Sequence, residues 1–115
     1  MNAHDWIKEF PAAINVCDKN GNLLELNDKA VKLFENVGGE KLIGTNILNC
    51  HDEHSRNKFE EMLKKPTVNY YLSEKNGNKK FIYQSPWYKD GAFMGYTEFV
   101  IEIPFDIPFR KFEKE

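Results

Sequence analysis

The last third of the chain reads NYYLSEKNGNKKFIYQSPWYKDGAFMGYTEFVIEI from Asn69 to Ile103, and this stretch decides the fold. Three runs rich in β-branched and aromatic residues predict three strands, at Asn69–Glu74, Lys79–Tyr88 and Phe93–Ile103. Asn76-Gly77 and Asp90-Gly91 join them, and such dipeptides accept the positive φ angles of tight hairpins. The stretch therefore predicts one curved antiparallel sheet, and the earlier residues must cover its face.

Length and composition indicate one soluble globular domain. The chain has 115 residues, of which 41% are hydrophobic and 30% charged, and its net charge is −2. This balance gives no basic field for nucleic acid, and no apolar run approaches the ~20 residues that cross a bilayer. The first residues do not form a signal peptide, so Cys17 and Cys50 are expected to be reduced thiols. We expect a cytoplasmic protein that binds neither nucleic acid nor membrane.

The residues before Asn69 alternate between strand and helix patterns. The pattern predicts a short helical segment at Asp5–Phe10, a hairpin of Ala13–Asp18 with Asn22–Leu26, a helix from Asn27 to about Asn36, and a longer helix from about Cys50 to Lys65. Asn27 is the expected N-cap of the first long helix, with Lys29 or Ala30 as N–H donor, and Asn49 that of the second. The fold class is therefore α+β.

Several short motifs make the chain resemble a PAS sensor domain. Pro11-Ala12-Ala13-Ile14 with Asp18-Lys19-Asn20-Gly21-Asn22 is similar to the opening PAS hairpin. Leu26-Asn27-Asp28-Lys29-Ala30 is similar to the start of the first PAS helix, and Glu40-Lys41-Leu42-Ile43-Gly44-Thr45 to the element that precedes the next. The resemblance implies a five-stranded antiparallel sheet with helices packed on one face. It divides the chain into an N-terminal helical cap (1–10), a PAS domain (11–104) and a C-terminal extension (105–115).

The resemblance also implies a function. By this resemblance we expect a module that senses a signal or binds a partner without catalysis of its own. We expect it either to act on an effector outside this chain or to act alone through contacts. In PAS proteins the inner face of the long helix lines a cavity under the sheet, where a small ligand can bind. The alternative is an interior filled by side chains, in which each polar group is satisfied locally.

Strand parity predicts which residues line that cavity. We expect Thr97, Phe99, Ile101 and Ile103 on the core face of the last strand, and the PAS register turns Ile82 and Gln84 inward. On the long helix, His51, Ser55 and Phe59 share a stripe, while His54 and Lys58 fall on the opposite, solvated face. The predicted cavity residues are His51, Ser55, Phe59, Tyr70, Leu72, Gln84, Thr97 and Phe99.

The same register predicts an aromatic patch on the outer face of the sheet, formed by Tyr71, Phe81, Tyr83 and Trp87. Because exposed apolar patches usually mark an interaction site, we expect the segment with Trp6, Ile7 and Phe10, or a second subunit, to cover it. A homodimer is the expected assembly. The alternative is a register shifted by one residue, which would make these rings part of the core.

Cys50 and His51 are the candidate reactive residues. His51 could be an axial ligand in a haem-based gas or redox sensor, which is the alternative function. A Cys50–His51 hydrolase and a zinc site with Cys17 and His54 both fail on spacing, because adjacent side chains point in different directions. Flavin-binding PAS domains carry Gly-x-Asn-Cys, and here Ile47 replaces that cysteine, which disfavours a flavin adduct. The sequence names no cofactor beyond these alternatives.

Overall fold

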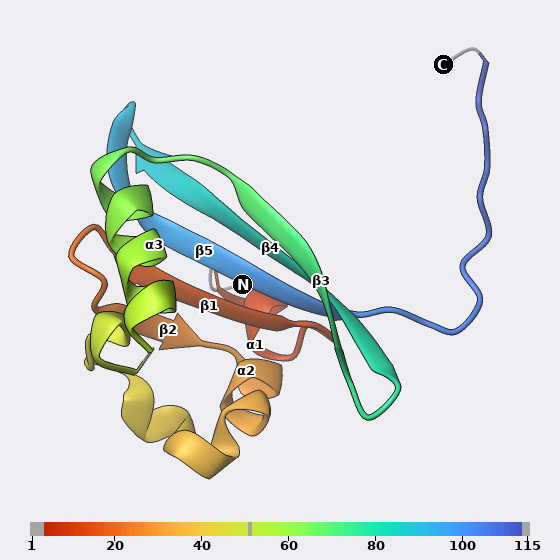
Figure 1. Cartoon of the computed structure of the whole chain (residues 1–115), viewed down its shortest axis with the longest axis horizontal. Coiled ribbons are helices and arrows are strands. Elements are labelled where there is room, and N and C mark those ends of the chain that lie inside the picture. Colours follow the sequence, from red (N-terminus) through yellow and green to blue (C-terminus); the bar gives the residue numbers. More distant parts are fainter. Residues whose placement is uncertain (1–3, 51, 114–115) are drawn as a thin grey trace.

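The computed structural model describes residues 4–50 and 52–113 and contains a five-stranded antiparallel sheet with the strand order β2-β1-β5-β4-β3 (Figure 1). The strands are β1 (Ala13–Asp18), β2 (Leu23–Leu26), β3 (Asn69–Lys75), β4 (Asn78–Lys89) and β5 (Ala92–Glu102). The fold is α+β, as the sequence predicts, and the predicted strands agree with the observed ones to within one or two residues.

The two C-terminal hairpins have the predicted turns. Asn76 and Gly77 have φ angles of 53° and 80°, and Asp90 and Gly91 have 50° and 80°. Positive φ at both central residues is the hairpin geometry that matches the right-handed twist of the strands. The Asn76-Gly77 turn sets the register of β3 on β4. Between β4 and β5 the register shifts by one residue at Trp87 and Tyr88, and the three strands form a meander.

β5 crosses β1 so closely that only glycine fits at one position. Gly95 has a φ of +148°, and a Cβ there would collide with the carbonyl oxygen of Cys17. Trp87 pairs with Gly95 across the strands, and its indole Nε1 donates a hydrogen bond of 3.1 Å to the same Cys17 carbonyl. The glycine therefore lets the meander join the N-terminal hairpin in one sheet.

One face of the sheet carries the helical layer. It consists of α2 (Asp28–Leu33), three 3₁₀ turns (Glu35–Val37, Gly39–Leu42 and Ile47–Cys50) and α3 (Glu53–Lys64). As predicted, Asn27 caps α2 by accepting from the N–H of Ala30. The predicted start of α3 was wrong, because Asp52 rather than Asn49 is the N-cap. The extended backbone of Asp52 lets its carboxylate accept from Ser55 N–H at 2.8 Å.

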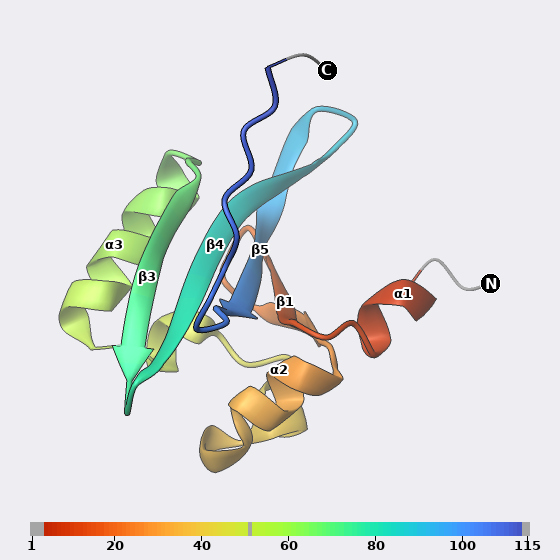
Figure 2. The same ribbon diagram turned by 90° about the vertical axis from the view of Figure 1, so that its right-hand side faces the viewer.

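α1 (Asp5–Lys8) lies on the opposite face of the sheet from α3, as the two views show (Figures 1 and 2). The side chain of buried Asn27 connects it to the sheet. The Asn27 amide nitrogen donates to the carbonyl oxygens of Ile7, at 3.1 Å, and Ala12, at 2.8 Å, while its oxygen accepts from the N–H of Ile14 at 2.9 Å. One side chain thus joins α1, β1 and the start of α2.

Two small clusters form the core. Ala13, Ala30, Ile82 and Val100 hold α2 against the sheet. Cys17, Met62 and Tyr96 hold the end of α3, with Phe59 and Phe93 packed beside them. The segment after β5 runs away from the domain, and its Phe105, Ile107, Phe109 and Phe112 are exposed (Figure 1). Within residues 4–50 and 52–113, no helix has the length and apolar character needed to span a membrane.

Candidate functional site

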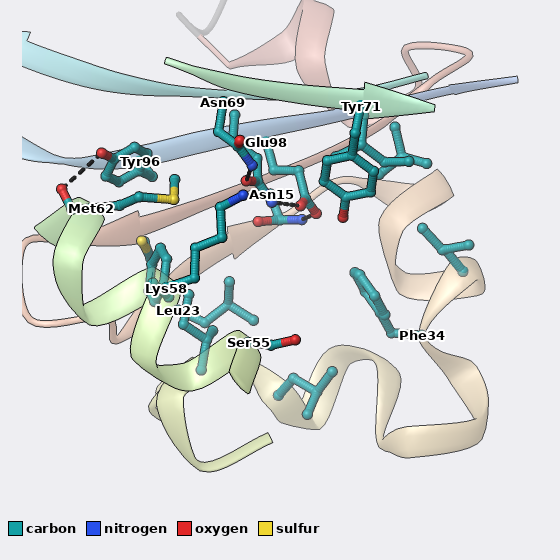
Figure 3. A pocket seen from close by; sticks show the side chains of 18 of the residues that line it. Asn15, Leu23, Phe34, Ser55, Lys58, Met62, Asn69, Tyr71, Tyr96 and Glu98 are labelled. Carbon is teal, nitrogen blue, oxygen red and sulfur yellow. Dashed lines mark hydrogen bonds between the residues drawn. The ribbon is translucent and has the colours of Figure 1, made fainter. Parts of the chain in front are cut away.

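A cavity of about 790 Å³ lies between α3, the helical layer and the inner face of the sheet (Figure 3). Its helical walls are mainly apolar, with Phe34, Leu42, Ile47, Phe59 and Met62 among the lining side chains. Its mouth is open to solvent, because Ser55 and Lys58 line it and are exposed. Concave sites with apolar walls and a few placed polar groups are typical of small-molecule binding.

The floor of the cavity is a row of four polar side chains that crosses four strands. Asn15, Glu98, Gln84 and Asn69 are direct cross-strand partners on β1, β5, β4 and β3. The Asn15 amide donates to one oxygen of Glu98 at 2.8 Å, and the Gln84 amide donates to the other at 2.6 Å. The Asn69 amide donates to Gln84 at 2.8 Å. Both oxygens of a half-buried carboxylate are thereby held in position.

Two further polar side chains reach this row from other elements. Tyr71 of β3 lies over the floor, and burial together with the nearby charge of Glu98 raises the pKa of its hydroxyl. Its hydroxyl is therefore a neutral hydrogen-bond donor at physiological pH. Lys58 extends from α3 toward Asn15 and Glu98 (Figure 3). The site thus combines an anchored anion, a cation on the facing wall and a phenol.

Tyr96 fixes the distance between α3 and the sheet. Its buried hydroxyl donates to the carbonyl of Met62 at 2.8 Å and accepts from the N–H of Thr67 at 3.0 Å. Burial raises the pKa of this hydroxyl, so it stays protonated and keeps the donor. The last turn of α3 and the following loop are attached to β5 in this way, and α3 remains the wall of the cavity.

The one cysteine whose side chain is described does not suit nucleophilic chemistry. Cys17 is 2% exposed, and burial raises its pKa to about 11. The reactive form of cysteine is the thiolate, which is scarce at neutral pH when the pKa is this high. Among the described residues, no group of histidine, cysteine and carboxylate side chains is placed to hold a metal ion. His51 and the side chain of Cys50 lie outside the described residues.

The structure places some of the predicted cavity residues in the cavity and others outside it. Ser55, Phe59 and Gln84 line it. The lining residues of β3 are Asn69, Tyr71 and Ser73, and those of β5 are Tyr96, Glu98 and Val100, so Tyr70, Leu72, Thr97 and Phe99 point to the outer face. The predicted parity of these two strands was wrong by one residue. His54 and Lys58, expected on the far side of the helix, are exposed but line the cavity.

The reason for the parity error is the apolar side chains that β5 carries on both faces. Phe99 and Ile101 suggest one core face, but Gln84 is inward, and its cross-strand partner Glu98 must share that face. The Asp90-Gly91 turn alone would pair Gln84 with Thr97, and a one-residue register shift between Trp87 and Tyr88 makes Glu98 its partner instead. Asn15 and Asn69 gave no signal of their own, because they join the row only through the sheet register.

The outer face of the sheet carries part of the predicted aromatic patch. Phe81 and Tyr83 lie there, as predicted, and contact Tyr70, whose ring centroid lies 6.4 Å from each of theirs. Tyr71 was wrongly included, since it lines the cavity. Trp6 packs edge-on against Phe10 in the α1 region. Tyr70, Leu72 and Tyr83 remain 65%, 67% and 38% exposed.

Comparison with solved structures decides the fold family. The PAS domain of the histidine kinase ThkA is 20% identical, with a TM-score of 0.63 over 78% of this chain and 97% of that one. The PAS domain of Bordetella pertussis BvgS is 23% identical, with a TM-score of 0.60 over 85% and 81%. The chain has the PAS fold. The Vibrio cholerae Aer2 receptor, described as a dual PAS-heme oxygen sensor, is 14% identical, with a TM-score of 0.61 over 81% and 95%.

Sequence-level comparisons add nothing to this assignment. No protein-family model matches the chain, and no curated protein matches it.

Proposed function

We propose that this chain is a PAS-type sensory module that binds a small ligand in the cavity and has no catalysis of its own. The observation that carries the proposal is the cavity itself, with apolar helical walls and a fixed polar floor of Asn15, Glu98, Gln84 and Asn69. A ligand that binds two arrangements of α3 with different affinity shifts their populations. The sheet passes that shift to its outer face and to α1, which Asn27 connects to β1.

A cavity-filling substitution tests the proposal. The full chain is screened against a metabolite library by thermal unfolding, since a ligand at about 100 times its Kd stabilises by about 2.7 kcal/mol. Ser55→Trp should remove the stabilisation, because Ser55 lines the cavity. Asn57→Trp is the matched control, since Asn57 is exposed on the same helix and outside the lining. A ligand that stabilises both variants equally would bind elsewhere, and a chain stabilised by no metabolite would contradict the proposal.

The partner of the outer face is proposed to be a second copy of the chain. Two apolar surfaces of one chain support this: Tyr70, Phe81 and Tyr83 on the sheet, and Trp6 with Phe10 near α1. In a homodimer each surface covers its counterpart without a further protein. Sedimentation of the wild type and of Tyr83→Lys, with Tyr88→Lys as control, tests it. A monomeric wild type would leave an effector protein as the partner.

The alternative function is a haem sensor with His51 as axial ligand, supported by the position of His51 in the sequence and by the similarity to Aer2. The described walls do not fit haem well. The macrocycle would cover the charged row at Glu98, and burying a carboxylate against an apolar ring is costly. Absorption spectra of the protein expressed with haem supply, and of His51→Ala, test this alternative. A Soret band that the variant loses would establish it.

A further inference from the structure

The chemistry of the cavity floor limits the kind of ligand that fits. The hydrogen bonds of the row run toward Glu98. The Asn15 and Gln84 amides donate to its carboxylate, and the Asn69 amide donates to the oxygen of Gln84. These bonds orient the carboxylate before any ligand arrives. The amide oxygens at the ends of the row and the carboxylate itself are acceptors. The floor therefore favours a ligand that brings N–H donors and positive charge.

The facing wall has the opposite character. Lys58 extends across the cavity from α3, and Ser55 lies one turn earlier on the same wall (Figure 3). Within residues 4–50 and 52–113, neither Lys58 nor Glu98 forms an ion pair. A second lysine of the lining, Lys80, lies on β4. Its cross-strand neighbour in the register of β4 and β5 is Glu102, at the far end of the sheet.

Opposite charges on facing walls disfavour a ligand with one charge only. A carboxylic acid drawn to Lys58 meets Glu98 across the cavity, and an amine drawn to Glu98 meets Lys58. Unmatched charge in a partly desolvated site weakens binding. A ligand with both charges satisfies both walls. Its carbon skeleton can then contact Phe34, Ile47 and Phe59.

We infer that the ligand is a small zwitterion of the α-amino acid class, with its ammonium group on Glu98 and its carboxylate toward Lys58. The inference rests on the proposed function, because it takes the cavity to be a ligand site. Tyr71 supports it, since its neutral hydroxyl over the floor can donate to the ligand carboxylate or to Glu98. The side chain of the amino acid occupies the apolar end of the cavity and sets the preference among amino acids.

The first experiment compares matched probes on the full 115-residue chain by calorimetry. The proteinogenic amino acids are screened, and the tightest binder is compared with its decarboxylated amine and its deaminated acid. The amino acid should bind at least about tenfold more tightly than either analogue. An amine or an acid that binds as tightly as the amino acid overturns the inference, because one of the two charged walls then plays no part.

The second experiment assigns the two charges. Glu98→Gln and Lys58→Met should each weaken binding by about tenfold or more. The matched controls are Glu102→Gln, on the same strand and outside the lining, and Lys64→Met, in the last turn of α3. They should leave the affinity unchanged. Controls that weaken binding as much as the cavity variants overturn the assignment. Unfolding curves of the free variants verify that they are folded, and Lys58→Met tests the site independently of the floor.

The ligand class and the ligand-binding function can be refuted independently. If no amino acid binds but another metabolite stabilises the wild type and not Ser55→Trp, the inferred ligand class is overturned and the proposed sensory function stands. If no small molecule stabilises the chain, both the ligand class and the ligand-binding function are overturned.

Discussion

Replacing Asn27 by aspartate should destabilise the fold by about 2–4 kcal/mol, although the two side chains have nearly the same shape. The Asn27 side chain is buried and makes four hydrogen bonds, two as acceptor and two as donor. Aspartate keeps both acceptor bonds and strengthens them by its charge. It loses the two donor bonds, and its negative oxygen then faces the carbonyl groups of Ile7 and Ala12.

The magnitude follows from those two carbonyls. A buried polar group left without a partner costs about 1–3 kcal/mol, and the carbonyl of Ala12 is in the buried environment where that cost applies. The carbonyl of Ile7 is only partly buried, so water recovers part of its loss. The favourable effect of a negative charge at the start of α2 offsets about 0.3–1 kcal/mol. The sum stays clearly destabilising.

Urea unfolding followed by circular dichroism measures the change as a lower midpoint at an unchanged slope. Asn57→Asp is the matched control, because Asn57 is exposed on α3 and its substitution should change stability by no more than about 0.5 kcal/mol. If Asn27→Asp costs no more than the control, the amide of Asn27 does not hold α1 and β1 together, and the proposed route from the cavity to α1 loses its support.

Three further changes probe other parts of the molecule. Tyr96→Phe removes the hydroxyl's hydrogen bonds to Met62 and Thr67 and should lower the free energy of unfolding in urea by about 1–3 kcal/mol. The exposed Tyr88→Phe should change it by almost nothing, and equal costs would contradict the role of the Tyr96 hydroxyl. Gly95→Ala drives a Cβ into a backbone carbonyl of β1 and should abolish folding or cost more than about 4 kcal/mol, whereas Gly77→Ala, with open space around it, should cost about 1–2 kcal/mol. Desolvation acts to raise the pKa of Asp18, but backbone N–H donors outweigh it and the pKa is lowered. The contribution of Asp18 to folding stability is therefore full above the unfolded pKa of about 3.9 and is lost as the pH falls through the lower folded pKa. In thermal unfolding, the wild type should lose more stability than Asp18→Asn between about pH 4 and pH 2.

Much of the fold could be predicted because its determinants are local. Asn76-Gly77 and Asp90-Gly91 adopt the positive φ angles that their residue types accept, and the strands they join follow directly. Asn27 was identified as a cap from its position before a helical stripe. Asp52 was missed because Asn49 is an equally good cap by residue type. Asn49 lies inside a 3₁₀ turn at Ile47–Cys50, so it does not begin the long helix, which Asp52 caps.

The candidate site was only partly predictable. Ser55 and Phe59 were found because helix periodicity places them inward, and Gln84 was found from the register that the PAS resemblance implies. Glu98 was missed because its neighbours Phe99 and Val100 are both apolar, so alternation does not tell which face of β5 is inside. Hydrophobicity also argues against a glutamate in the interior. The glutamate is tolerated there because amides from two neighbouring strands donate to both of its oxygens.

The sequence by itself therefore determined the strands, the hairpins and the α+β class, because propensities, turns and caps depend on residues within a few positions of one another, and its motifs indicated the PAS fold by resemblance. Only the tertiary structure decided which face of β3 and β5 looks into the cavity, and which side chains meet there. Asn15 and Asn69 lie more than fifty residues apart and belong to one polar row only because the sheet register aligns four strands. A contact of that kind has no local signature, since its energy exists only after the strands have paired.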